Sequence, residues 1–196
     1  MYKLLLFILL FHCTLSFCQT QVDQKTLYES ALELTEQEVT YDPSYFSIPY
    51  PNGDVPSDKG VCTDVIIRAY RKLGIDLQKE VHEDMKANFD LYPKIWGLTG
   101  TDKNIDHRRV PNLMTFFSRK DAEQPITAAG SDYIPGDIVS WSLGGGTTHI
   151  GIVVDKKSAD GERYLIVHNI GAGQVLEDCL FNFEIIGHYR FGITTL

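Results

Sequence analysis

The stretch that organises this chain reads Gly60-Val61-Cys62-Thr63-Asp64-Val65-Ile66-Ile67-Arg68-Ala69-Tyr70-Arg71-Lys72-Leu73-Gly74. Its apolar side chains recur at helical spacing, and it follows a loop rich in Pro, Gly and Asp at positions 50–60. Gly74 suits the position just beyond the end of a helix. The pattern predicts an amphipathic helix whose first turn carries Cys62.

A cysteine at the start of a helix is a candidate nucleophile. Unpaired backbone N–H groups and the positive end of the helix dipole favour a thiolate there, with a pKa of about 3.5–7.5 instead of roughly 8.5. Free cysteines are also among the most buried residue types, so Cys62 could simply fill the core. Only partners elsewhere in the sequence can separate these two interpretations.

Composition indicates an ordinary globular protein. The 196 residues are 43% hydrophobic and 11% aromatic, enough for a single domain over residues 19–196 with its own core. The net charge of −8 argues against nucleic acid as a partner, because binding to phosphates depends on Lys and Arg. We expect a monomer.

Residues 1–18 have the pattern of a secretory signal peptide. Lys3 precedes an apolar run at 4–11 that is too short to span a bilayer, and Cys18 is a small residue at the expected cleavage point. We therefore expect an exported protein, periplasmic or secreted, with no integral membrane segment after cleavage. A lipoprotein anchored at Cys18 is less favoured, because Phe17 fits that signal poorly.

Two cysteines, Cys62 and Cys179, remain after removal of the leader. In an oxidising compartment they could form a disulfide, which is the main structural alternative to a catalytic Cys62. We favour free thiols, since a domain of this size does not need a covalent staple.

Helical patterns precede strand patterns along the chain. Helices are expected over residues 24–39, from 62 to 73, 77–89 and 111–120, and strands over 137–141, 149–155, 163–168 and 185–191. This order predicts an α+β fold, with a helical N-terminal half packed on an antiparallel sheet of about four to six strands.

Two histidines stand at comparable ends of neighbouring strands. His149 begins one strand and His168 ends the next, so a hairpin would bring both to the same rim of the sheet. If the helix carrying Cys62 packs across that rim, the three residues could act as nucleophile, base and orienting group. The plain alternative is that each histidine satisfies a backbone carbonyl.

A zinc site formed by Cys62, His149 and His168 is chemically allowable. The sequence has no paired-ligand motif such as Cys-x-x-Cys or His-Glu-x-x-His. We therefore expect neither a metal nor another cofactor.

The segment 104–113 concentrates ionisable side chains before Pro111, which fits the first position of a helix. It could be a salt-bridged helix start or an arginine fork that binds a carboxylate of a substrate. Trp96, in the preceding connector, is either a core residue or a substrate platform. The supporting or substrate-binding candidates are Asp64, Asp106, His107, Arg108, Arg109 and Asn169.

Several motifs together resemble one bacterial family. They are Tyr50-Pro51-Asn52-Gly53-Asp54-Val55-Pro56, Gly60-Val61-Cys62-Thr63-Asp64, the segment 104–113, Pro135-Gly136-Asp137, His149-Ile150-Gly151-Ile152-Val153 and His168-Asn169-Ile170-Gly171-Ala172-Gly173. On these motifs the chain, from about Tyr41 to Phe191, resembles the domain of unknown function 1287 family. That family resembles a branch of the papain-like NlpC-type cell-wall peptidases.

The resemblance implies a papain-like (NlpC-type) fold and a cysteine peptidase or amidase. Cys62 would be the nucleophile, His149 the general base and then acid, and His168 the residue that orients His149, with Asn169 as a fallback. The implied reaction is cleavage of an amide bond, with peptidoglycan stem peptides as the expected substrate. The residues flanking Cys62 and the segment 104–113 depart from the NlpC-type pattern.

Two other functions remain open from the sequence. A non-catalytic cell-envelope binding module would keep the cleft and hold a peptide or glycan without cleaving it. A cysteine acyltransferase or esterase would act on a small or lipid substrate through the same thiol.

Overall fold

The computed structural model describes residues 23–192, and the signal peptide expected at residues 1–18 lies outside this range. The longer helices are α1 (Gln24–Leu34), α2 (Cys62–Lys72), α3 (Leu77–Ala87) and α4 (Val110–Arg119). Three short 3₁₀ helices, η1 (Phe89–Leu91), η2 (Asp106–Arg108) and η3 (Gly130–Asp132), lie in the connections. None of the helices within the described range is long and apolar enough to cross a bilayer.

The main sheet is antiparallel and has the strand order β6-β5-β4-β3-β7. Its strands are β3 (Ile138–Gly144), β4 (Thr147–Lys157), β5 (Tyr164–His168), β6 (Val175–Glu177) and β7 (Glu184–Tyr189). A separate parallel pair joins β1 (Thr40–Tyr41) to β2 (Lys59–Gly60). The expected α+β class is confirmed, with five strands in the main sheet.

Two features of the sheet differ from the sequence prediction. Strand β6 was missed because three residues are too few to show a period of two. Strand β7 pairs with β3 instead of β6, so the chain crosses from one edge of the sheet to the other. The last strand therefore does not pair with the strand that precedes it in the sequence, as it would in a simple meander.

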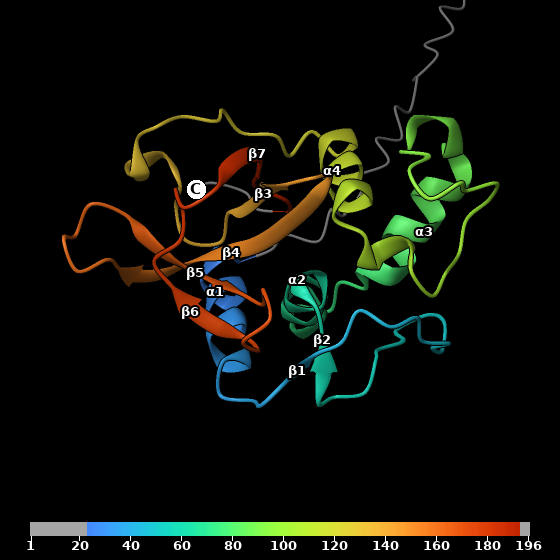
Figure 1. Cartoon of the computed structure of the whole chain (residues 1–196), viewed down its shortest axis with the longest axis horizontal. Coiled ribbons are helices and arrows are strands. Elements are labelled where there is room, and N and C mark those ends of the chain that lie inside the picture. The colour runs from blue at the N-terminus through green and yellow to red at the C-terminus, as the bar shows by residue number, and fades with distance from the viewer. Residues whose placement is uncertain (1–22, 193–196) are drawn as a thin grey trace, which may run out of the picture.

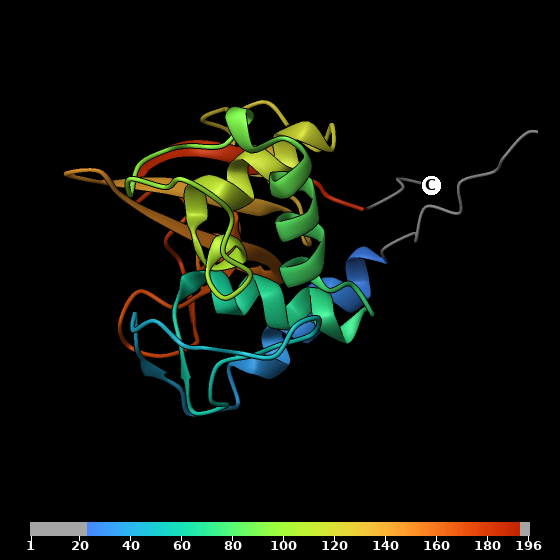
Figure 2. The same ribbon diagram turned by 90° about the vertical axis from the view of Figure 1, so that its right-hand side faces the viewer.

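The helices gather on one side and at one end of the sheet. In Figure 1, α1 and α2 lie side by side below β4, and both contact this strand. Figure 2 shows α3 (green) and α4 (yellow-green) side by side above α2 (teal). This arrangement brings the start of α2 to the part of the sheet where β3 and β4 meet.

Alternate residues of the strands enter two different cores. On β4, Ile150 and Ile152 pack with the helices, together with Phe116 of α4. Val153 faces the other way and joins Trp141 in a smaller cluster on the far face of the sheet. The period of two therefore divides the sheet residues between a helix-covered core and a loop-covered core.

The end of α2 follows a local sequence signal, whereas the end of α1 depends on a tertiary contact. Gly74 has φ of +80° directly after α2, as the sequence predicts for the residue beyond the helix end. Helix α1 ends at Leu34, five residues before the predicted limit at position 39. There the Gln174 amide donates to the Leu34 carbonyl (2.8 Å), so a distant side chain satisfies a carbonyl at the helix end.

Asp137 of the Gly136-Asp137 motif stabilises the fold. Asp137 is fully buried and accepts hydrogen bonds from Arg190 Nε (2.7 Å) and Nη2 (2.9 Å), and its Oδ2 lies 2.8 Å from His188 Nε2. It also accepts from the Ile134 N–H (2.9 Å). One carboxylate thus ties the turn before β3 to the end of β7.

We predict that Asp137→Asn destabilises the protein by about 3 kcal/mol, because it leaves the mostly buried Arg190 guanidinium without its counter-charge. Urea denaturation followed by tryptophan fluorescence measures the change. Asp178→Asn is the control: Asp178 forms an exposed pair with Arg163, and its loss should leave the free energy of unfolding nearly unchanged. Equal effects of the two substitutions would contradict the role given to Asp137.

Candidate active site

Cys62 is the first residue of α2, at a helix start fixed by a buried ion pair. Asp64, in the first turn, accepts from the Val61 N–H (2.7 Å), whereas Val61 at the N-cap has no side chain that could cap the helix. The same carboxylate binds Arg108 in a bidentate manner: Nε donates to Oδ1 and Nη2 to Oδ2, each at 3.0 Å. The start of α2 is therefore joined to η2.

The Cys62 thiol lies at an open edge of β4. Strand β5 ends at His168, which pairs with Gly151, so the β4 residues before Gly151 have no partner on that strand. The Ile150 N–H there reaches the Cys62 thiol as a hydrogen-bond donor. At the same junction the Asn169 amide donates to the Gly60 carbonyl (3.3 Å), which holds the end of β5 against the residues preceding α2.

Gly151 makes the close pairing of β4 with β5 possible at this point. A Cβ atom at position 151 would lie 2.6 Å from Cγ2 of Ile166 and 3.1 Å from Cβ of His168. A larger residue would push His168 away from β4. Close packing of β4 against β5 thus explains why the His149-Ile150-Gly151-Ile152 motif has a glycine at position 151.

The two predicted histidines form a hydrogen-bonded pair that continues to a carboxylate. His149 Nε2 lies 2.8 Å from His168 Nδ1, and His168 Nε2 lies 3.1 Å from Glu177 Oε2. An ionised carboxylate only accepts, so His168 carries its proton on Nε2 and accepts at Nδ1 from His149 Nε2–H. This order leaves Nδ1 of a neutral His149 as a free proton acceptor.

No sequence pattern indicates Glu177, which lies on the three-residue strand β6. Its register opposite Ile166 brings its carboxylate to the imidazole two residues further along β5. Trp141 supports the pair from the other side: its ring stacks on His149 with centroids 5.6 Å apart. Only the pairing of β6 with β5 could have revealed Glu177, and the sequence shows no periodicity for it.

The expected triad is assembled in part. The contact between His149 and His168 is present, whereas no hydrogen bond joins the Cys62 thiol to an imidazole within residues 23–192. The thiol contacts the backbone of Ile150, the residue directly after His149. Asn169, the fallback for orienting His149, bonds Gly60 instead.

Burial determines the charge of the site. It raises the pKa of Cys62 to about 12, against the lowering effect of the N–H groups of Ile150, Thr63 and Cys62 itself. Burial and the neighbouring His168 lower the pKa of His149 to about 3. The expectation of a thiolate near neutral pH is therefore wrong for this structure, in which the thiol and the His149 imidazole are both neutral.

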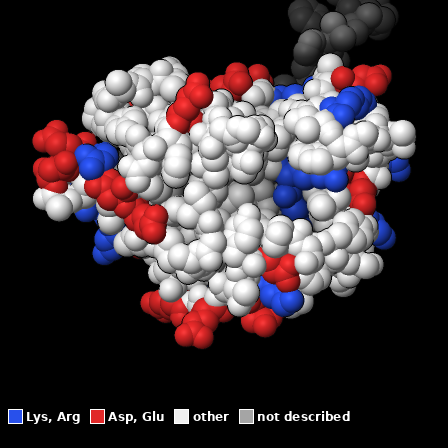
Figure 3. Space-filling model, in the orientation of Figure 1, with Lys and Arg blue, Asp and Glu red and all other residues white. Residues whose placement is uncertain are grey.

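A cleft of about 440 Å³ opens over Cys62. Its lining residues come from β1 and the loop after it, the start of α2, the segment around η2 and α4, and the β3–β4 turn: Tyr41, Pro43, Val61, Cys62, Trp96, Ile105, Arg108, Arg109, Val110, Pro111, Gly146, Thr147 and Thr148. Two arginines and no acidic residue belong to this lining. Figure 3 shows acidic side chains around the left, upper and lower edges of this face, and basic ones beside a hollow to the right of its centre.

The segment 104–113 divides its ionisable side chains between two roles. Asp106 is buried and accepts from the Asp102 N–H (2.8 Å), with His82 Nδ1 at 3.0 Å, and His107 is buried outside the cleft lining. Arg108 is bound to Asp64. A salt bridge within the segment, between Asp106 and Arg108 or Arg109, is therefore not formed in the described part of the chain: Arg108 makes its ion pair with Asp64 of α2 instead. Arg109 alone is left as a candidate for binding a carboxylate.

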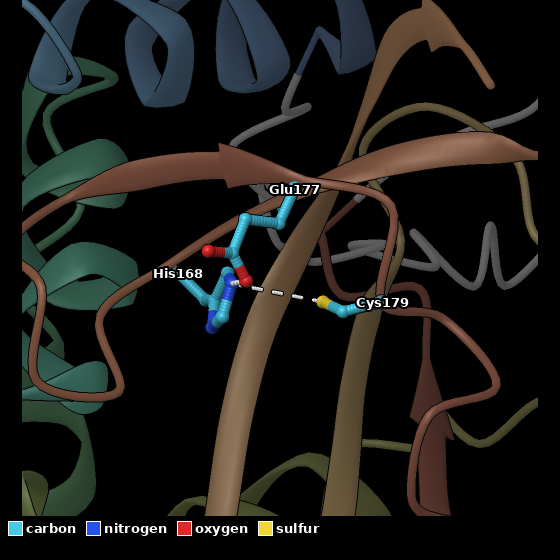
Figure 4. Close-up of side chains that lie close together, drawn as sticks. All are labelled: His168, Glu177 and Cys179. Atoms are coloured by element: carbon cyan, nitrogen blue, oxygen red, sulfur yellow. Dashed lines mark hydrogen bonds and ion pairs between the residues drawn. The ribbon is translucent and has the colours of Figure 1, made fainter. Parts of the chain in front are cut away.

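The second thiol, Cys179, lies on the far face of the sheet. Cys62 and Cys179 are free and belong to different cores, so the disulfide alternative is wrong. Cys179 Sγ lies 3.6 Å from His168 Nε2, and Figure 4 shows both side chains turned toward Glu177. These three could hold a metal ion, since their donor atoms lie within 4.8 Å of one another. They are not the zinc ligands considered from the sequence.

The fold and the site together define the class of this protein. It is an α+β protein in which a buried thiol at a helix start contacts the strand that carries one histidine of a hydrogen-bonded pair. The chain belongs to the family described as Domain of unknown function (DUF1287), which matches residues 28–191. It is similar to the Uncharacterized protein YijF of Escherichia coli (strain K12), with 56% identity over 151 residues, 77% of this chain and 73% of that protein. The expected family is confirmed.

We predict that Glu177→Gln lowers the pKa of His168 and shifts its proton between the two ring nitrogens. The Glu177 carboxylate favours the protonated ring, opposing the burial that lowers the pKa of His168, and a neutral amide removes that support. Nitrogen-15 NMR of the imidazoles over a pH titration measures both effects. Glu36→Gln, at an exposed position, is the control, and unchanged His168 resonances in Glu177→Gln would contradict the hydrogen-bond order given above.

Proposed function

We propose that this protein is an exported thiol hydrolase, a cysteine peptidase or amidase, that cleaves an amide bond in peptidoglycan stem peptides. One observation carries the proposal: the Cys62 thiol lies at a helix start in a cleft and contacts the backbone of Ile150, directly after His149, whose side chain begins the His149–His168–Glu177 chain. The expected leader at residues 1–18 and the resemblance to NlpC-type enzymes support the location and the substrate.

The first chemical step needs a proton acceptor for the neutral thiol. His149 Nδ1 is the free acceptor, and it takes the Cys62 proton as the sulfur attacks the carbonyl carbon of the amide. His168 then stabilises the His149 imidazolium through its Nδ1, and Glu177 keeps the His168 proton on Nε2. Hydrogen bonds of this kind often shorten only when substrate binds, which fits the missing direct contact in the free protein.

Backbone N–H groups at the start of α2 are placed to stabilise the transition state. The N–H groups of Cys62 and Thr63 lie close enough to the thiol to affect its pKa, and they can donate to the oxyanion that forms on the attacked carbonyl. The His149 imidazolium returns its proton to the leaving amine. Water, activated by the neutral His149, then hydrolyses the thioester and releases the acid.

One observation favours a second candidate function. The raised pKa of Cys62 and its burial would also suit an inert thiol in a cell-envelope binding module. In that case the cleft holds a wall peptide and no bond is cleaved. The digestion described next separates the two functions.

We predict that the chain without residues 1–18 releases new fragments from purified peptidoglycan and defined muropeptides, read by mass spectrometry. Cys62→Ala should lower the rate by about 10⁴-fold or more, because the nucleophile and its base act as a unit. Intact wall bound by both proteins, with no fragments from either and Cys62 shown to be reduced, would establish the binding module instead.

On the acid side, kcat/KM should fall only at an unusually low pH. His149 acts as a base only when neutral, and its pKa is lowered to about 3, so activity should persist as the pH falls from 7 to 5 and decline only as it approaches that pKa. A histidine with the ordinary pKa of about 6.5 would lose most activity by pH 5. Circular dichroism at each pH checks that the fold is intact, and half-loss near pH 6.5 would be inconsistent with a buried neutral base.

A further inference from the structure

Arg109 is a cation without a protein partner in the wall of the Cys62 cleft. Its guanidinium makes no hydrogen bond or ion pair within the described residues, and its Nη1 atom is buried with no partner. Arg108, its neighbour in sequence, is fully engaged with Asp64 and the Ser44 carbonyl. The unused donors therefore belong to Arg109 alone.

Trp96 holds the Arg109 guanidinium in place. The Cζ atom lies 4.2 Å from the centroid of the Trp96 ring, and Trp96 also lines the cleft. Contact with an aromatic ring occupies a face of the planar guanidinium and leaves its N–H edge available to a ligand. Trp96, which the sequence left as either a core residue or a platform, is about half exposed and acts as the platform.

The nearby acids do not neutralise Arg109. Asp102 and Asp106 are close enough to affect its pKa, but burial is the stronger influence and lowers that pKa. Asp102 accepts from the Tyr45 hydroxyl and the Asn104 N–H. Asp106 is engaged through Oδ2 with His82, its Oδ1 has no partner, and neither carboxylate forms an ion pair with Arg109 within the described residues. A partly desolvated cation with free donors is best satisfied by an anion that arrives with the ligand.

We infer that Arg109, supported by Trp96, binds a carboxylate of the substrate and so selects acyl compounds that carry a free carboxylate near the cleaved bond. The inference rests on the proposed function and narrows it to acidic peptides. Arginine suits this ligand because its fork can donate two parallel hydrogen bonds to one carboxylate. Amidation of that carboxylate should weaken binding by about 10- to 100-fold, because a charge-assisted pair is lost.

Alkylation of Cys62 with matched reagents tests the inference without requiring turnover. Iodoacetate is compared with iodoacetamide, and N-iodoacetylglycine with N-iodoacetylglycinamide. Within each pair a carboxylate is replaced by an amide, and the two pairs differ in length. Peptide mass spectrometry reads the rate at Cys62 separately from Cys179 between pH 7 and 9.5. The anion-to-amide rate ratio, divided by the ratio for glutathione, is the measured quantity.

We expect a normalised ratio of about 10 or more for at least one length in the wild type, falling to about 1 in Arg109→Gln. Arg109→Lys, which keeps the charge and loses the fork, should fall between them and covers the case in which Arg109→Gln does not fold. Arg163→Gln removes the same charge at a site bound to Asp160 and Asp178, and should leave the ratio unchanged.

The outcomes separate the inference from the proposed function. A reactive Cys62 whose ratio is the same in the wild type and Arg109→Gln overturns the carboxylate site and leaves the hydrolase standing. A Cys62 that resists all four reagents in the native protein but reacts in urea overturns the inference, because no reagent that carries a carboxylate then reaches the thiol through Arg109. The hydrolase is decided separately by the digestion of peptidoglycan, since a neutral thiol reacts slowly with alkylating agents in either case.

Discussion

The buried pair of Asp64 and Arg108 is the interaction on which the candidate site depends. Taking two charges out of water is costly, and the cost is offset here by bidentate geometry and by further donors, the Val61 N–H to Asp64 and Arg108 Nη1 to the Ser44 carbonyl. The pair joins the start of α2 to η2 across 44 residues of sequence. Residues of both elements line the cleft, so the ion pair holds two parts of its wall together.

The site balances two opposing effects on the thiol. The helix start and nearby N–H groups favour a negative sulfur, whereas burial favours the neutral form and prevails. A neutral thiol resists oxidation and adventitious alkylation, since the thiolate is the reactive species. Under the proposed function, a base must therefore act at the moment of attack. The chain from His149 to Glu177 would provide that base with a fixed proton order, which a single histidine could not ensure.

The sequence was a good guide where local rules apply. The limits of α2 followed from helical spacing and Gly74, and the approach of His149 to His168 followed from the alternation and pairing of two long strands. Glu177 and the end of α1 could not be predicted, because they depend on a three-residue strand and on a contact from Gln174. Arg108 and Arg109 show the limit most clearly. They are identical adjacent residues, and only the position of Asp64 in space gives them different roles.

This division of the two arginines also explains how an acidic protein could recognise an acidic ligand. The chain carries a net charge of −8, so its long-range field repels anions, but at physiological ionic strength that field is screened over about 8 Å. A contact between Arg109 and a carboxylate in a partly buried cleft is screened far less. Recognition would then depend on the local fork held by Trp96. The overall negative charge would mainly slow the approach of anions to the protein, and an anion that does not bind at Arg109 would gain nothing to offset this repulsion.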